Sequence, residues 1–144
     1  MKKTLNTETL INAPLHRVWQ ILLDFAAYPQ WNPFVTHISG DIQTGGRLHI
    51  TVQPVGGKAM SFSPRVLTAE KPEFRWKGKL LLPGLFDGEH FFRLDDLGNG
   101  QTKLVHGEHF SGLLVGLFAR SLEQGTLAGF EKMNLALKQR SEQA

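Results

Sequence analysis

The spacing of apolar residues predicts one long helix near the C-terminal end of the chain, between Leu113 and Arg140. Apolar side chains recur there every three or four residues, at Leu114, Phe118, Leu122, Met133 and Ala136. The segment also contains Gly116, Gly125 and Gly129. Because a glycine inside a helix costs roughly 1 kcal/mol relative to alanine, these glycines indicate close packing, a slight bend, or space beside the helix.

The first third of the chain predicts a strand, a helix and a second short strand. Thr4–Asn12 is expected to be a strand, and Ala13–Pro14 to open a helix, since proline is tolerated in a first helical turn. Two prolines, Pro29 and Pro33, end the helical pattern. Val35–Ser39 is expected to be a short strand. The helical stripe itself consists of Val18, Ile21, Leu22 and Phe25.

The middle of the chain predicts antiparallel strands joined by short turns. Pro64 indicates an edge or a bulge, and turns are expected at Pro83–Gly84 and at Gly98-Asn99-Gly100. Such a meander forms a curved sheet whose concave face needs an apolar cover. The predicted fold class is therefore α+β, with the sheet wrapped around the C-terminal helix. The expected strands are Leu48–Val52, Met60–Val66, Phe74–Leu80, Phe86–Asp95 and Thr102–Phe110.

Composition narrows the possible functions. A chain of 144 residues is expected to form one domain, residues 1–144. The sequence has no cysteine, which excludes a disulfide framework, a thiolate zinc site and a cysteine nucleophile. The net charge of +3 comes without a cluster of basic residues, so nucleic-acid binding is not expected. Neither a signal peptide nor a membrane span is predicted, and we expect a cytoplasmic protein without stable membrane insertion.

Charged residues set the phase of the last strands. If Lys77, Arg93 and Lys103 face outwards, alternate residues face inwards. Three polar residues then fall on the inner face: His90, His106 and Glu108. Because a short hairpin joins their strands, we expect the three side chains to lie within hydrogen-bonding reach of one another.

Several chemical roles remain open for this inner polar group. It is a candidate general base, since a histidine near a carboxylate can accept a proton and burial can tune the pKa of either group. It is equally a candidate for orienting a ligand in an apolar pocket, or a structural pair without a ligand. A metal site is geometrically possible but not expected, since His106 and His109 point to opposite faces of a strand. No cofactor is expected.

Short motifs along the chain resemble those of a known superfamily. They are Ile11-Asn12-Ala13-Pro14, Val18-Trp19, the run Asp24–Phe34, Gly88-Glu89-His90-x-Phe92-x-Leu94 and Glu108-x-Phe110-Ser111-Gly112. Together they resemble the START-like, or SRPBCC, superfamily, and within it the polyketide cyclase/dehydrase-like branch. The resemblance implies one SRPBCC domain with a helix-grip fold, and a deep apolar cavity between the sheet and the long helix for a small hydrophobic ligand. No known catalytic motif of the superfamily transfers cleanly to this chain.

Two classes of function follow from these observations. The first is a carrier or sensor that binds a small hydrophobic or aromatic metabolite or lipid. The alternative is a cyclase/dehydratase-like enzyme in which the His–Glu group abstracts a proton next to a carbonyl and the pocket positions the substrate for ring closure. Trp31 and Phe34 are expected at the mouth of the pocket. The full set of expected ligand contacts is Trp31, Phe34, Trp76, His90, Phe92, Leu104, His106, Glu108, Phe110, Phe118 and Leu122.

Overall fold

Two antiparallel sheets form one curved wall in the computed structural model, which describes residues 1–80 and 84–143. Backbone hydrogen bonds from Gly45 to Val66 and from Leu48 to Pro64 join the sheets. The larger sheet has the order β1-β8-β7-β6-β5 and the smaller one β2-β3-β4. The strands are β1 (Lys2–Ile11), β2 (Val35–Gly40), β3 (Leu48–Val52), β4 (Met60–Phe62), β5 (Arg65–Thr68), β6 (Glu73–Leu80), β7 (Phe86–Gly98) and β8 (Gln101–Ser111).

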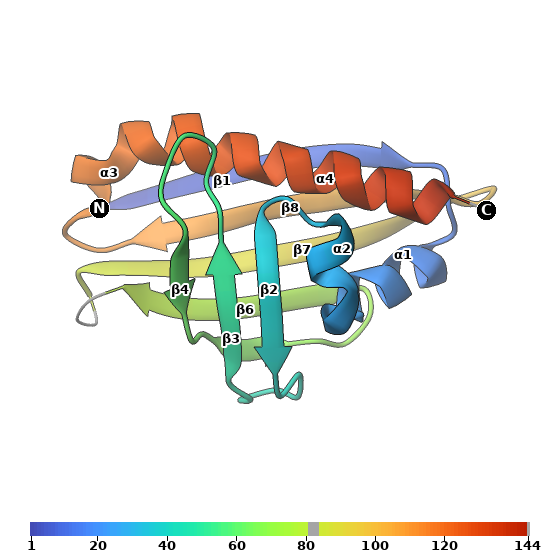
Figure 1. Ribbon diagram of the computed structural model, residues 1–144, viewed down its shortest axis with the longest axis horizontal. Helices are drawn as coiled ribbons and strands as arrows, with labels where there is room; N and C mark the ends of the chain where they lie inside the picture. The colour runs from blue at the N-terminus through green and yellow to red at the C-terminus, as the bar shows by residue number, and fades with distance from the viewer. Residues whose placement is uncertain (81–83, 144) are drawn as a thin grey trace.

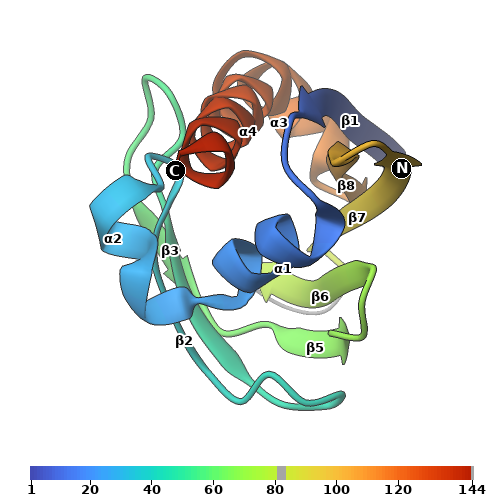
Figure 2. The same cartoon turned by 90° about the vertical axis from the view of Figure 1, so that its right-hand side faces the viewer.

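The C-terminal helix crosses the concave side of this wall (Figure 1). Viewed from the end of the molecule, the sheets curve around the interior, α4 closes the open side, and α1 covers one end (Figure 2). The predicted α+β class and helix-grip arrangement are therefore confirmed. The helices are α1 (Leu15–Leu23), α2 (Tyr28–Trp31), α3 (Val115–Ser121) and α4 (Leu127–Glu142), and a 3₁₀ turn (Phe25–Ala27) joins α1 to α2.

The predicted helix from Leu113 to Arg140 is present with three differences, the first being that it ends at Glu142. A π-helical turn (Leu122–Thr126) interrupts it, and here the carbonyl of Gly125 accepts a hydrogen bond from the N–H of Val55. The helix begins later than predicted, at Val115, and the N–H groups of Leu113 and Leu114 before it donate to the carbonyls of Gly84 and Leu85. No helix among the residues described is long and apolar enough to cross a membrane.

The predicted strands are confirmed except for Met60–Val66, which was expected to be one strand with an edge or a bulge at Pro64. The chain breaks there into β4 and β5, which belong to different sheets. Pro64 lies between them and lacks an N–H group for a strand ladder, so the chain changes sheets at this residue. Asn99 has a φ of 53°, as the predicted hairpin turn requires. Of the other predicted turn, Pro83 lies outside the described residues.

Close packing explains one of the helix glycines. The ring of Phe34 occupies the place where a Cβ atom on Gly129 would lie, so this glycine leaves no space beside the helix. Phe34 in turn packs edge-on against the buried ring of Phe130, with the centroids 5.3 Å apart. The helix can therefore approach the smaller sheet closely at Gly129, and the interior is solid there.

This contact predicts an unusual response to alanine. Gly129→Ala is expected to lower the free energy of unfolding by about 1–3 kcal/mol through overpacking, although alanine normally stabilises a helix by roughly 1 kcal/mol relative to glycine. Gly116→Ala is the matched control, since that glycine is exposed and faces only the flexible side chain of Met1. Urea unfolding of both variants tests this. Equal stabilisation by the two substitutions would contradict the packing described.

Candidate functional site

A cavity with a volume of about 880 Å³ lies between the sheets, the loop of residues 54–59 and the first half of the C-terminal helix. Its volume falls within the range of small-molecule sites. His90 and Glu108 bring polar groups to the wall, and the exposed residues Val55, Lys58 and Met60 form the rim. Most of the remaining wall is apolar, including Phe34, Val52, Phe62, Phe86, Phe110, Phe118 and Leu122.

Six of the eleven expected ligand contacts lie on this wall: Phe34, His90, Glu108, Phe110, Phe118 and Leu122. Phe34 is nevertheless buried and not at a mouth, which corrects the expectation for this residue. Phe118 is the most exposed of the six, with 42% of its surface accessible at the open side.

The structure places the other five expected contacts away from the wall of the cavity: four lie in the solid core, and Trp31 is partly buried and packs against it. Trp76 stacks behind His90 with 4.4 Å between ring centroids, and Trp31 packs edge-on against Tyr28. Phe92, Leu104 and His106 are also fully buried. Strand alternation identified the correct face for the four residues that lie on strands, but α1 packs against β7 and β8 and covers one end of the sheet. The position of a residue along the strand therefore decides whether it meets the cavity.

Two glycines in the strands of the cavity wall were not predicted. Gly78 and Gly88 are cross-strand partners in β6 and β7, and both line the cavity. The carboxyl group of Glu108 occupies the place where a Cβ atom on Gly88 would lie. The signal was present in the sequence, because each glycine shares the inward phase of Trp76 or His90. An isolated glycine inside a strand often marks a close approach by another group.

The structure brings His90, His106 and Glu108 together. His90 Nδ1 lies 3.0 Å from Glu108 Oε1, and His90 Nε2 lies 2.7 Å from His106 Nε2. The register of β7 and β8 produces this arrangement, since it places His90 directly opposite Glu108. The pairing of β7 and β8 is regular at Gly107, without a bulge. Side chains therefore alternate between the two faces of the strand, as the prediction of inward-facing His106 and Glu108 requires.

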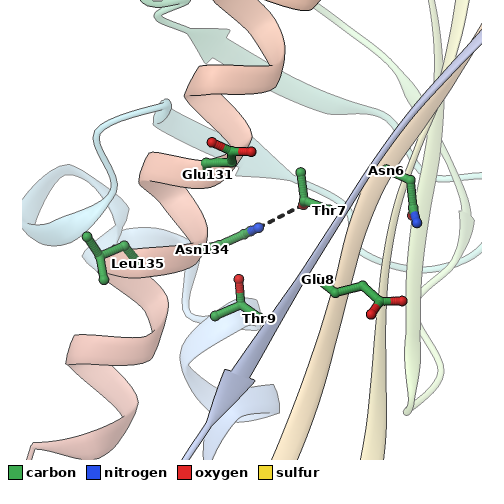
Figure 3. A pocket seen from close by; sticks show the side chains of 7 residues that line it. All are labelled: Asn6, Thr7, Glu8, Thr9, Glu131, Asn134 and Leu135. Carbon is green, nitrogen blue, oxygen red and sulfur yellow. Dashed lines mark hydrogen bonds between the residues drawn. The ribbon is translucent and has the colours of Figure 1, made fainter.

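Two further residues extend this group on the side away from the cavity. His106 Nδ1 lies 2.7 Å from Asn134 Oδ1, and Asn134 Nδ2 donates to Thr7 Oγ1 at 2.7 Å. Thr7 Oγ1 donates to the carbonyl of His106, also at 2.7 Å. Figure 3 shows Asn134 pointing from α4 towards Thr7 of β1. The sequence carried one signal for this contact, since Asn134 is a polar residue one turn after the apolar Phe130.

Burial keeps the three titratable groups uncharged at neutral pH. Desolvation lowers the pKa of His90 to about 3. It lowers the pKa of His106 well below its ordinary value, and the nearby His90 adds to this effect. Burial raises the pKa of Glu108 to about 8, although the adjacent His109 opposes the shift. The polar end of the cavity therefore presents hydrogen-bonding groups without a formal charge.

A metal site is not formed by these side chains. Within residues 1–80 and 84–143, no cluster of three or more histidine and acidic residues has an arrangement that could hold a metal ion.

Comparison with known proteins identifies relatives by sequence and by fold. Residues 2–142 match the family of polyketide cyclases/dehydrases and lipid transport proteins. A search of curated proteins finds no match to the chain.

Solved structures share the fold at low sequence identity. A START superfamily protein from Mycobacterium smegmatis is 23% identical, with a TM-score of 0.73, over 96% of this chain and 97% of that one. The Zhui aromatase/cyclase from Streptomyces sp. R1128 is 16% identical, with a TM-score of 0.72, over 97% and 96%. The di-domain ARO/CYC BexL from the BE-7585A pathway is 10% identical, with a TM-score of 0.74. That match includes 98% of the present chain but only 48% of BexL, so the chain spans about half the length of BexL.

The shifted acidity of Glu108 predicts a pH-dependent effect of Glu108→Gln on stability. Between the ordinary pKa of 4.5 and about 8, the folded chain retains a proton that the unfolded chain has released. The stability of the wild type therefore falls as the pH rises through this window. Glutamine does not titrate, so the free energy of unfolding of the variant relative to the wild type should rise by up to about 1.4 kcal/mol per pH unit.

Urea unfolding of both proteins at about pH 5, 6.5 and 8 measures this difference. A difference that stays constant across the range would contradict the raised pKa of Glu108.

Proposed function

Because the chain belongs to the polyketide cyclase/dehydrase and lipid transport family, we propose that it binds a small hydrophobic or aromatic molecule in the cavity beside its C-terminal helix. The observation that carries the proposal is a cavity of about 880 Å³ whose walls are mostly apolar and whose inner end holds His90 and Glu108. This combination of apolar walls with a few polar groups is typical of small-molecule sites.

The physical properties of the cavity favour an apolar occupant. Burying apolar surface contributes about 25 cal/mol for each Å² removed from water, and the aromatic walls supply a large area for such contact. Among the described residues, the polar groups at the inner end, His90 and Glu108, are uncharged, so a charged group on the buried part of a ligand would lose hydration without gaining an ionic partner.

The loop of residues 54–59 is the proposed entrance. Its residues Val55 and Lys58 are exposed, as is Met60 at the start of β4, and a backbone hydrogen bond from Val55 to Gly125 ties the loop to the π-helical turn. Phe118 lies partly exposed on the same open side. Breaking a single hydrogen bond costs little net free energy, about 0.5–1.5 kcal/mol, so ligand entry through this gap needs no unfolding of the sheet.

A cyclase/dehydratase-like reaction is the second candidate function, and the state of Glu108 favours it. A protonated carboxyl group beside the cavity is suited to act as a general acid that gives a proton to a departing hydroxyl group. This role differs from the general base suggested by the sequence. Glu108→Gln separates the two functions, because glutamine preserves the shape and hydrogen bonds but releases no proton. Unchanged ligand affinity with lost turnover would favour the enzyme.

The binding proposal predicts that Nile red, a neutral apolar dye, binds with one-to-one stoichiometry. Ser121→Trp places a large ring on the cavity wall and is expected to weaken dye binding at least tenfold, or about 1.4 kcal/mol. Gln139→Trp is the control, since it adds the same ring to an exposed position of α4 away from the cavity. Fluorescence titration measures both. The proposal fails if the wild type binds no dye, or if both variants bind it equally well.

A further inference from the structure

In the row of hydrogen bonds behind the cavity, the hydroxyl of Thr7 determines which atom donates and which accepts in each bond. The hydroxyl of Thr7 has a single proton, which it donates to the carbonyl of His106, since a carbonyl cannot donate. Thr7 Oγ1 must therefore accept from the amide nitrogen of Asn134. This fixes the orientation of the Asn134 side chain and leaves its oxygen, Oδ1, facing His106 Nδ1.

The direction then propagates to the cavity. His106 Nδ1 carries the proton that it donates to Asn134, so the Nε2 atom of this neutral ring is an acceptor. The contact between the two rings therefore requires His90 Nε2 to donate. Nδ1 of the neutral His90 ring is consequently an acceptor, and the contact with Glu108 Oε1 is satisfied only if Glu108 carries a proton there. If Glu108 were ionised, its Oε1 atom would face the lone pair of His90 Nδ1 with no proton between them.

Building on the proposed ligand-binding function, we propose that Thr7 and Asn134 are positioning residues that hold Glu108 as an uncharged acid, whose Oε2 atom accepts a hydrogen bond from a hydroxyl group of the ligand. Oε1 is used by His90, whereas Oε2 lies beside Gly88 on the cavity wall and has no hydrogen-bond partner among the described residues. The ligand class is therefore a mainly apolar alcohol or phenol without a charge at its buried end.

The charged groups around Glu108 do not supply a competing counter-ion at the inner end of the cavity. On the adjacent strand, Glu89 pairs with Arg75. Lys58 and Lys79 line the cavity but are exposed to solvent, which screens their charges. From the helix side, the polar residues on the wall are the uncharged Ser121, Gln124 and Thr126. His109, next in sequence, lowers the pKa of Glu108, but the effect of burial exceeds it. The direction of the hydrogen bonds and the burial therefore favour the same protonation state.

The far end of the chain of hydrogen bonds opens on a different surface. A groove of about 390 Å³ between β1 and α4 is lined by Asn6, Thr7, Glu8, Thr9, Glu131, Asn134 and Leu135 (Figure 3). Neither Thr7 nor Asn134 lines the ligand cavity. Substitutions at these two positions can therefore change the state of Glu108 without altering the surface that a ligand touches.

The test is a ¹³C NMR titration of the Glu108 carboxyl group, identified by its loss in Glu108→Gln. Thr7→Val removes the hydroxyl and frees the Asn134 amide to turn over, so that every donor can point towards Glu108. The pKa of Glu108 should then fall from about 8 by about one unit or more. Thr7→Ser keeps the hydroxyl and should retain the wild-type value. A folded Thr7→Val protein with an unchanged pKa of Glu108 would overturn the inference.

Asn134→Leu provides an independent variant of similar volume. It removes the acceptor of the His106 Nδ1 proton, so it should also allow the reversed direction and lower the pKa of Glu108. An unchanged pKa of Glu108 in this variant would overturn the inference even if Thr7→Val failed to fold.

A pair of probes tests the predicted ligand class in the wild type at about pH 6.5. 2-Naphthol carries a hydroxyl donor, whereas 2-methoxynaphthalene has a similar apolar body and an oxygen without a proton. We expect 2-naphthol to bind at least about fivefold more tightly by calorimetry, and equal affinities would overturn the assignment of Oε2 as an acceptor. If neither probe binds, the proposed ligand-binding function fails, and the NMR titration still decides the role of Thr7 and Asn134.

Discussion

A carboxyl group and two imidazole rings are buried side by side in this protein, and the cost of removing them from water constrains the rest of the structure. Such groups are tolerated in an apolar interior only when they are uncharged and hydrogen-bonded to one another. His90 and Glu108 come from neighbouring strands in register, His106 from the same strand as Glu108, Asn134 from α4 and Thr7 from β1. All of these hydrogen bonds form only when α4 is packed against the sheet and β7 and β8 are paired in this register. The polar group therefore links the position of the C-terminal helix to the register of the sheet.

The same arrangement divides the interior into a solid part and a hollow part. Towards α1, closely packed aromatic rings such as Trp76 and Phe92 fill the space, and Phe34 packs directly on Gly129. Towards α3, the helix widens into a π-helical turn, and a cavity of about 880 Å³ lies beneath it. Glu108 lies between the solid part and the cavity, whose wall it lines, and 15% of its side chain is exposed. A ligand in the cavity would thus meet apolar walls on most sides and the uncharged His90 and Glu108 at its inner end. This arrangement fits selective binding of a hydrophobic molecule and also the chemistry of an acid catalyst.

Much of this could be predicted from the sequence, because alternation along strands depends only on local residue order. The residue pattern predicted the strands, the C-terminal helix that the sheet surrounds, and the inward orientation of His90, His106 and Glu108. It could not identify the depth of a residue along a strand, since that depends on which helix covers that end of the sheet; Trp76, Phe92 and Leu104 were therefore assigned to a cavity that they do not line. Thr7 and Asn134 are separated by most of the chain, and only the folded structure places them in contact. Pro64 marked an irregularity, but nothing local indicated that the chain passes between two sheets there.

The most direct test of the account is a neutron crystal structure of the deuterated, ligand-free protein at about pH 6.5, because neutrons locate the protons of buried side chains. We expect deuterium on Glu108 Oε1, on His90 Nε2 and on His106 Nδ1, with none on His90 Nδ1. Deuterium on His90 Nδ1 beside an ionised Glu108 would contradict it.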